Sequence, residues 1–186
     1  KMLPLNFIFA VHFINKFQLM AKRYKIYDEP SALTSVAAFH DLFDLPVVEK
    51  PAFPSASRCQ LRVSLLQEEL NELKQAIEDN DIVGVADALA DLQYVLSGAV
   101  LEFGLGDKFK KLFDEVQRSN MSKTCKSLDV ALATQQYYKD TKGVESYIVD
   151  REGEYIVYRQ EDSKVLKSIA YSEADLDLII NEDFKY

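Results

Sequence analysis

Acidic side chains gather on two stretches in the middle of the chain that both have helical periodicity and few basic neighbours. At about 100° per residue, the acids of the first stretch fall within about 100° of one another, and those of the second share one face of a nearly apolar helix. Like charges four residues apart repel, and carboxylates without partners are costly to bury. The pattern therefore requires counter-charge. The acids are Glu68, Glu69 and Glu72 on the first stretch, and Asp87 and Asp91 on the second.

The first of these helices is predicted over 58–78 and the second over 82–103, joined by the turn 79–81. If the helices pair antiparallel, the acids become level, since each set lies roughly eight to twelve residues from the turn. Such a cluster suits a hard cation such as Mg²⁺, which binds few carboxylates and keeps positions for water and phosphate. The alternatives are a solvated acidic face or a buried ion-pair network. The basic candidates nearby are Arg58, Arg62 and Lys74.

Both predicted helices also carry apolar residues on more than one side. On the first, Leu61, Leu65 and Ala76 share the acidic stripe, while an opposite stripe runs through Val63, Leu66, Leu70, Leu73 and Ile77. A short chain offers too few partners to cover all of these surfaces. We therefore expect a homodimer or a homotetramer that completes a helical bundle.

Composition narrows the function further. The 186 residues are 48% hydrophobic and 28% charged, with a formal net charge of -8. No cationic excess exists to neutralise a nucleic acid, so we expect no nucleic-acid partner, and an acidic protein that takes a phosphorylated substrate needs cations. Two cysteines and two histidines are too few for a disulfide framework, a zinc site or a Ser-His-Asp triad. They fit a reduced, cytoplasmic protein.

The chain divides into three predicted parts. Residues 1–30 form an apolar N-terminal extension in which Leu3–Met20 is too short and too polar to span a membrane. It is either an amphipathic helix or a segment ahead of a true start at Met20, and a secretory signal is disfavoured. Residues 31–125 form an all-helical domain, with a first helix over 31–43. Residues 126–186 form an appendage.

The appendage mixes helix and strand signals. A helix is predicted over 127–142 and a hairpin over 146–159, because β-branched and aromatic residues flank a turn at Glu152-Gly153. A further strand around 165–169 and a final helix that starts in 172–175 complete the pattern. Within the helical domain, Asp107 is expected to cap a helix that runs to about Ser122. The predicted fold class is therefore mainly α with a small β-hairpin/α appendage.

The acidic motifs resemble those of a known superfamily. Glu68-Glu69-x-x-Glu72 followed by Asp87-Ala-Leu-Ala-Asp91 is similar to the EExxE and ExxD pattern of the all-α nucleoside triphosphate pyrophosphohydrolases, which include MazG-like proteins. The strings 86–92, 101–104 and 114–123 resemble the phosphoribosyl-ATP pyrophosphohydrolase-like branch. The likeness covers about residues 33–125. One position departs, because the first acid of ExxD would fall on Ala88, whereas Asp87 stands one place earlier.

The resemblance implies a Mg²⁺-dependent hydrolase, with Mn²⁺ as an alternative ion, that converts a nucleoside triphosphate to the monophosphate and pyrophosphate. It also implies a role in removing unwanted nucleotides from the cell (house-cleaning). It implies Glu69, Glu72, Asp87 and Asp91 as metal ligands and Glu68 and Glu69 as catalytic groups. It also implies that Asn120 and Lys123 contact the substrate. Phosphoribosyl-ATP cleavage and a non-catalytic nucleotide-binding or assembly role are the alternatives. Base preference is open, since Phe39, Phe53 and Tyr94 fit a core equally well.

Overall fold

The structure, a computed structural model, describes residues 24–182, so the apolar segment predicted at Leu3–Met20 lies outside the described residues. The described chain is mainly helical with one small hairpin, as the sequence predicts. Its elements in order are α2 (Ala32–Leu42), α3 (Ala56–Glu78), α4 (Ile82–Glu102), the 3-10 helix η1 (Gly106–Lys108), α5 (Phe109–Met121), α6 (Leu128–Lys142), β1 (Ser146–Arg151), β2 (Glu154–Arg159) and α7 (Leu176–Ile180).

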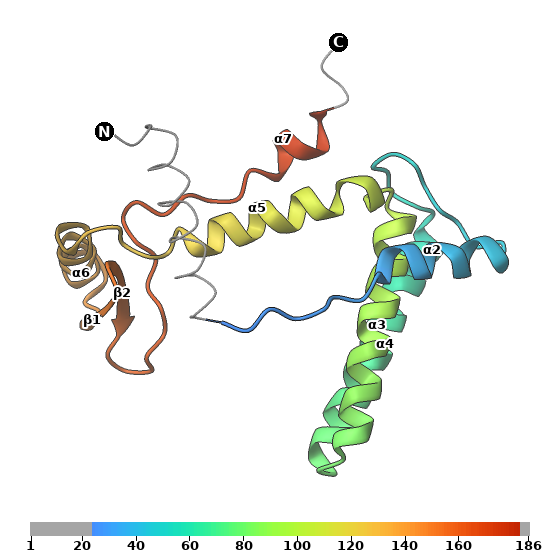
Figure 1. Ribbon diagram of the computed structural model, residues 1–186, viewed down its shortest axis with the longest axis horizontal. Helices are drawn as coiled ribbons and strands as arrows, with labels where there is room; N and C mark the ends of the chain where they lie inside the picture. The colour runs from blue at the N-terminus through green and yellow to red at the C-terminus, as the bar shows by residue number, and fades with distance from the viewer. Residues whose placement is uncertain (1–23, 183–186) are drawn as a thin grey trace, which may run out of the picture.

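Helices α3 and α4 form a long antiparallel hairpin, whose closed end projects away from the other elements in Figure 1. The Ser55 hydroxyl accepts a hydrogen bond from the Arg58 backbone N–H and caps α3. The Asp81 carboxylate caps α4 by accepting from Val83 N–H at 3.0 Å. Local capping chemistry therefore fixes both helix starts, and the predicted antiparallel pairing is confirmed.

A buried ion cluster holds the open end of this hairpin together. Glu102, near the end of α4, is 1% exposed and accepts hydrogen bonds from Arg58 and Arg62 of α3, with Arg58 Nε at 3.1 Å from its Oε2. His40 of α2 lies beside Arg62, its Nε2 at 3.4 Å from Arg62 Nη2. Burying Glu102 is tolerated because two guanidinium groups surround it. Three helices therefore meet at this cluster.

The connection between α2 and α3 wraps around the same end of α4. Val48 N–H donates to Leu101 carbonyl oxygen, and Ala52 N–H donates to Phe103 carbonyl oxygen. The backbones approach so closely that a Cβ on Gly104, which has φ +67°, would lie 2.0 Å from the Lys50 carbonyl oxygen. Only glycine fits at position 104. The proline-rich connection forms no helix or strand, as predicted, and its backbone hydrogen bonds hold it against the end of α4.

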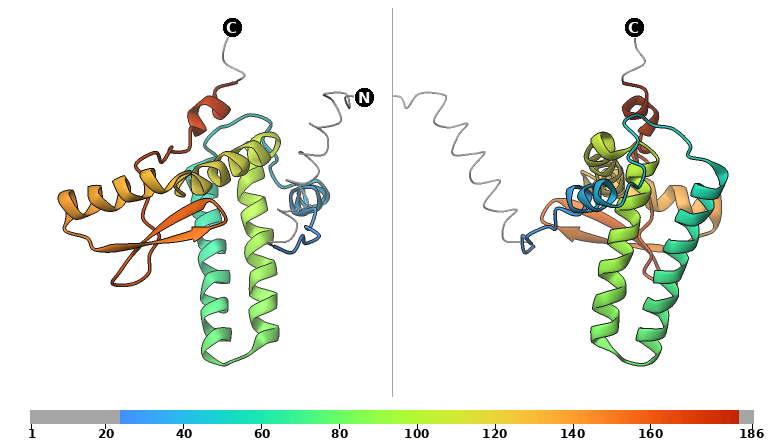
Figure 2. Two further views of the ribbon diagram at one scale, coloured as in Figure 1. Left: turned by 60° about the vertical axis from the view of Figure 1, so that its left-hand side comes forward. Right: turned by 90° about the vertical axis from the view of Figure 1, so that its right-hand side faces the viewer.

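Beyond α4 the chain leaves the hairpin. In Figure 1, α5 extends sideways from the open end of the hairpin, whereas the closed end points away from the other elements in both views of Figure 2. Helix α7 packs on α5. The strands β1 and β2 pair antiparallel in the register Ser146 with Arg159, and α6 covers them. This appendage has its own small core. The members of that core are Cys125, Ala131, Val157 and Leu166.

Two local predictions need correction. The strand expected over 165–169 is only an isolated bridge from Val165 to Tyr158, because Ile169 N–H donates to the Thr134 hydroxyl instead of a strand partner. Asp107 caps no helix, since it lies inside η1.

The predicted start of the final helix is confirmed. The Asp175 carboxylate caps α7 by accepting a hydrogen bond from Leu178 N–H at 3.2 Å, and the helix ends at Ile180. The Asp175 N–H donates to Glu115, which ties this helix start to α5.

Helix α4 has the length and hydropathy of a membrane span, the one such helix among residues 24–182. Core helices of soluble proteins pass the same test, so length and composition alone are weak evidence of a membrane. Three carboxylates interrupt this helix, and it packs along α3 and against α2.

Gly98 of α4 makes room for the buried ion cluster. A Cβ at this position would lie 2.6 Å from Arg62 Nη1, a group that Glu102 holds in place. Alanine has a higher helix propensity than glycine, which would stabilise the variant by about 1 kcal/mol. Overpacking, however, costs about 1–3 kcal/mol, and breaking a buried ion pair costs more. We predict that Gly98→Ala lowers the free energy of unfolding by about 2 kcal/mol in urea titrations. Gly106→Ala, where only a Leu101 methyl lies at 3.3 Å, is the control. A stabilised Gly98→Ala variant would contradict the packing described.

Candidate functional site

The five predicted carboxylates lie along the paired helices α3 and α4, and Glu69 is at their centre. Glu69 is half-buried, and its Oε2 is buried without a hydrogen-bond partner among the described residues. Partial removal from water raises the pKa of Glu69, and the negative charges of Glu72, Asp91, Glu68 and Asp87 raise it further. The structure therefore brings both predicted acidic sets together around one carboxyl group.

No basic side chain compensates this charge among residues 24–182. Arg58 and Arg62, which the sequence offered as counter-ions, pair with Glu102 instead. Lys74 lies 3.7 Å from Glu78, one turn further along α3. The ion-pair alternative for the five carboxylates is therefore wrong in the chain described, and the negative charge of the cluster remains unbalanced.

The donor set suits a hard cation. In the part of the chain that the structure describes, no three His, Cys, Asp or Glu side chains are arranged to hold one metal ion, and Glu68, Glu72, Asp87 and Asp91 are exposed. Mg²⁺ does not need such a cage, because it binds through one or two carboxylates and completes its shell with water and phosphate oxygens. The buried, unpartnered Glu69 Oε2 and its acidic neighbours fit this requirement.

Asn120 and Lys123 do not reach the carboxylates within one chain. Asn120 is near the end of α5, and Lys123 follows it and donates a 2.7 Å hydrogen bond to the Asn120 side-chain oxygen. The end of α5 lies away from the α3–α4 hairpin in Figure 1. Their role as substrate contacts stays a prediction, and it requires the carboxylates of another chain or a large rearrangement.

Apolar side chains on α3 and α4 remain uncovered. On α3, Val63 is 68%, Leu70 50% and Ile77 59% exposed, and these residues belong to the stripe that faces away from the acids in sequence. On α4, Leu89 and Leu96 are exposed as well. Several exposed apolar side chains on neighbouring helices are typical of a protein interface. It provides the surface that the predicted oligomer requires.

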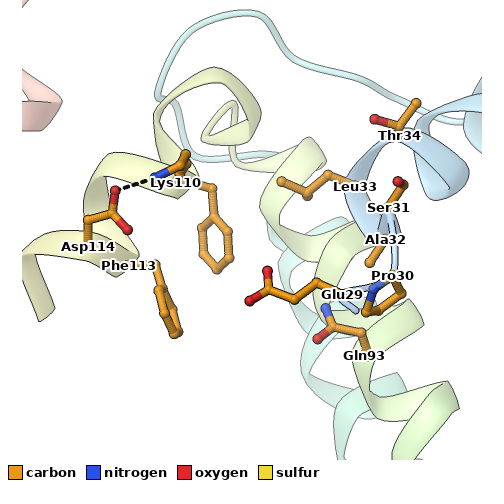
Figure 3. Close-up of a pocket in the computed structure, with 11 residues that line it drawn as sticks. Glu29, Pro30, Ser31, Ala32, Leu33, Thr34, Gln93, Lys110, Phe113 and Asp114 are labelled. Atoms are coloured by element: carbon orange, nitrogen blue, oxygen red, sulfur yellow. Dashed lines mark hydrogen bonds and ion pairs between the residues drawn. The ribbon is translucent and has the colours of Figure 1, made fainter. Parts of the chain in front are cut away.

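Two cavities lie beside α4. The larger, of about 710 Å³, separates the start of α2 from α5, with Glu29 and Gln93 on one side and Phe113 on the other, as Figure 3 shows. Its lysine, Lys110, already pairs with Asp114 at 2.5 Å. None of the predicted site residues lines this cavity, and we assign it no ligand.

The smaller cavity, of about 190 Å³, lies between α2, α3 and α4 next to the buried ion cluster. Phe39 and Tyr94 line it, whereas Phe53 is 90% exposed and packs on Phe103. The contacts of Arg62 with Glu102 and His40 were not predicted from the sequence. Two features of the sequence indicate them: Arg58 and Arg62 are spaced i, i+4, and Glu102 is a single glutamate in an apolar helix.

Comparison with known proteins agrees with this fold and donor set. The family model for phosphoribosyl-ATP pyrophosphohydrolase matches residues 36–120, which contain α3, α4 and all five carboxylates. Residues 36–120, a little under half of the chain, are thus similar to a family of the MazG-like all-α nucleoside triphosphate pyrophosphohydrolase superfamily. The description of that family names a pyrophosphohydrolase, an enzyme that hydrolyses phosphoric anhydride bonds.

A second comparison finds a relative whose name states no function. An uncharacterized protein of Acanthamoeba polyphaga mimivirus is 30% identical over 143 residues, which is 67% of this chain and 57% of that protein. The chain therefore spans a little over half the length of this relative.

Glu69 provides a test of the cluster that does not depend on turnover. A raised pKa means that the charged carboxylate destabilises the folded state at neutral pH, so Glu69→Gln should raise the melting temperature without metal. Millimolar Mg²⁺ should raise the melting temperature of the natural chain by about 3 °C or more, and that of the variant by less. Thermal unfolding followed by circular dichroism measures both.

The matched control is Glu78→Gln on the same helix, whose side chain is exposed and pairs only with Lys74. It should respond to Mg²⁺ as the natural chain does. If Mg²⁺ stabilises the natural chain and Glu69→Gln equally, the carboxylate cluster is not where the ion binds.

Proposed function

We propose that the chain hydrolyses a nucleoside triphosphate to the monophosphate and pyrophosphate with Mg²⁺ held by the carboxylates of α3 and α4. The observation that carries this proposal is the unbalanced negative charge around the half-buried Glu69. Charge of this kind is costly unless a cation joins it, and the substrate brings three further phosphate groups. A divalent ion between them offsets both sets of negative charge.

The side chains divide the work by their positions. Glu69, Glu72, Asp87 and Asp91 would hold the metal, which when bound neutralises phosphate charge and acidifies a coordinated water. Glu68 adjoins Glu69 on the exposed side of α3, where it can orient the attacking water and accept its proton. The water oxygen adds to the α-phosphorus. The bond between that phosphorus and the oxygen bridging to the β-phosphorus breaks, and pyrophosphate leaves.

We further propose that the active form is a homodimer or homotetramer. The exposed apolar side chains of α3 and α4, Val63, Leu70 and Ile77 among them, support an interface between copies. A second chain would also offer a route for Asn120 and Lys123 to reach the phosphates, which they do not reach within one chain. The apolar face and the incomplete site thus favour the same assembly.

Phosphoribosyl-ATP cleavage is a second candidate, because the matching family model carries that description. It uses the same metal chemistry and breaks the same kind of anhydride bond. The two candidates differ only in what is attached to the triphosphate. A panel of nucleoside triphosphates and phosphoribosyl-ATP, assayed for pyrophosphate release, distinguishes them.

Loss of a central carboxylate should abolish turnover. We predict that Glu69→Ala or Asp91→Ala lowers the rate of Mg²⁺-dependent pyrophosphate release more than about a hundredfold, because even indirect support of metal ligands is worth about 10- to 100-fold. The circular dichroism spectrum should not change, since both side chains lie outside the buried core. Glu78→Ala is the control and should retain full rate. Full activity in either cluster variant would contradict the assignment.

A further inference from the structure

The small cavity between α2, α3 and α4 lies directly next to the carboxylate cluster along the same pair of helices. Its lining from α3 extends to Leu65, one turn before Glu69, and its lining from α4 begins at Tyr94, three residues after Asp91. At about 1.5 Å of rise per residue, roughly 5 Å separates the two along each helix. A molecule whose phosphates lie at the carboxylates therefore has its other end beside this cavity.

The cavity suits one planar group rather than a whole nucleotide. Its volume of about 190 Å³ is below the range of roughly 300–1,000 Å³ of sites that enclose entire small ligands. Phe39 and Tyr94 supply aromatic surface, with ring centroids 5.7 Å apart and planes at 81°. The remaining walls are largely aliphatic. They include Val36, Leu45, Leu61, Leu65 and Val95.

Arg62 gives the cavity its polarity. The side chain is 6% exposed, and its Nε–H has no hydrogen-bond partner among the described residues. Buried donors without partners are rare, and such a group points to a ligand that accepts a hydrogen bond. Two guanidinium groups, Arg58 and Arg62, also face a single carboxylate, Glu102, so the cluster carries an excess of positive charge.

His40 supplies no free hydrogen-bond acceptor to the cavity. Its Nδ1 lies 2.9 Å from the carbonyl oxygen of Pro46, which can only accept, so Nδ1 carries the proton. The other ring nitrogen, Nε2, is then an acceptor and is occupied by Arg62 Nη2 at 3.4 Å. Arginine has donors only. The polar end of the cavity therefore presents a donor to whatever enters.

We propose that this cavity binds the base of the nucleotide and that Arg62 selects guanine, uracil and thymine over adenine and cytosine. The proposal rests on the proposed function, which places the triphosphate at Glu69. The edge of a base that lies opposite its sugar then reaches deepest, toward Arg62. That edge carries a carbonyl oxygen in guanine, uracil and thymine, but an amino group in adenine and cytosine, which would place a donor against a donor.

Equilibrium binding tests this without turnover. The probes are the α,β-imido analogues of GTP, UTP, ATP and CTP and, as a probe without a base, inorganic tripolyphosphate, titrated calorimetrically into the full chain with Mg²⁺. The GTP and UTP analogues should bind at least about tenfold more tightly than the ATP and CTP analogues, because the latter leave Arg62 unpaired.

Variants then locate the effect. Arg62→Lys keeps a charge for Glu102 but removes the Nε–H, and it should abolish the preference among bases. Tyr94→Leu should weaken all four analogues and leave tripolyphosphate binding unchanged. Phe53→Leu, an aromatic residue outside the cavity, is the matched control. If Arg62→Lys does not fold, the four-base comparison and Tyr94→Leu still decide.

Each outcome has a distinct meaning. Equal affinity for the four analogues, or weaker tripolyphosphate binding in Tyr94→Leu, overturns the base pocket while the proposed function stands. If neither tripolyphosphate nor any analogue binds in the presence of Mg²⁺, the proposed function fails, and the base pocket fails with it.

Discussion

The distribution of charge along the α3–α4 hairpin is the constraint on which the other features depend. Near the open end, Arg58 and Arg62 both form ion pairs with the carboxylate of Glu102. Toward the middle, five carboxylates share the same pair of helices with no basic partner among the described residues. The cations that could have neutralised the middle are held at the end. We propose that an ion from solution neutralises the middle.

This arrangement explains why an acidic protein could act on a polyanion. The phosphates of a nucleotide would meet carboxylates only through a divalent ion, while the base would meet a donor at the cation-rich end. Within the described chain, one pair of helices thus carries two adjacent surfaces of opposite electrostatic character. Gly98 and Gly104 preserve this arrangement, since a side chain at either would displace Arg62 or the connection before α3. Within one chain, the carboxylates lie on the hairpin, and α5 and the appendage do not contribute to their cluster.

Local sequence signals predicted the parts of the site that local chemistry fixes. Ser55 and Asp81 accept hydrogen bonds from backbone N–H groups at the starts of α3 and α4. The short turn 79–81 pairs these helices antiparallel, so the carboxylates of α4 lie near Glu69 of α3, as the number of residues from the turn predicts. Contacts between distant segments could not be predicted. Arg58 and Glu102 are 44 residues apart, and no periodicity indicates that they pair. The hydrogen bond from the Asp175 N–H to Glu115 of α5 is another such contact, between residues 60 apart.

The location of a bound ion tests the central claim most directly. Crystals of the full chain grown with Mn²⁺ and a non-cleavable nucleotide analogue would show the ion by anomalous scattering. The account predicts an anomalous peak between α3 and α4 with Glu69 and at least one of Glu72, Asp87 and Asp91 among its ligands. A peak elsewhere, with Glu69 neutralised by a basic side chain instead, would contradict it.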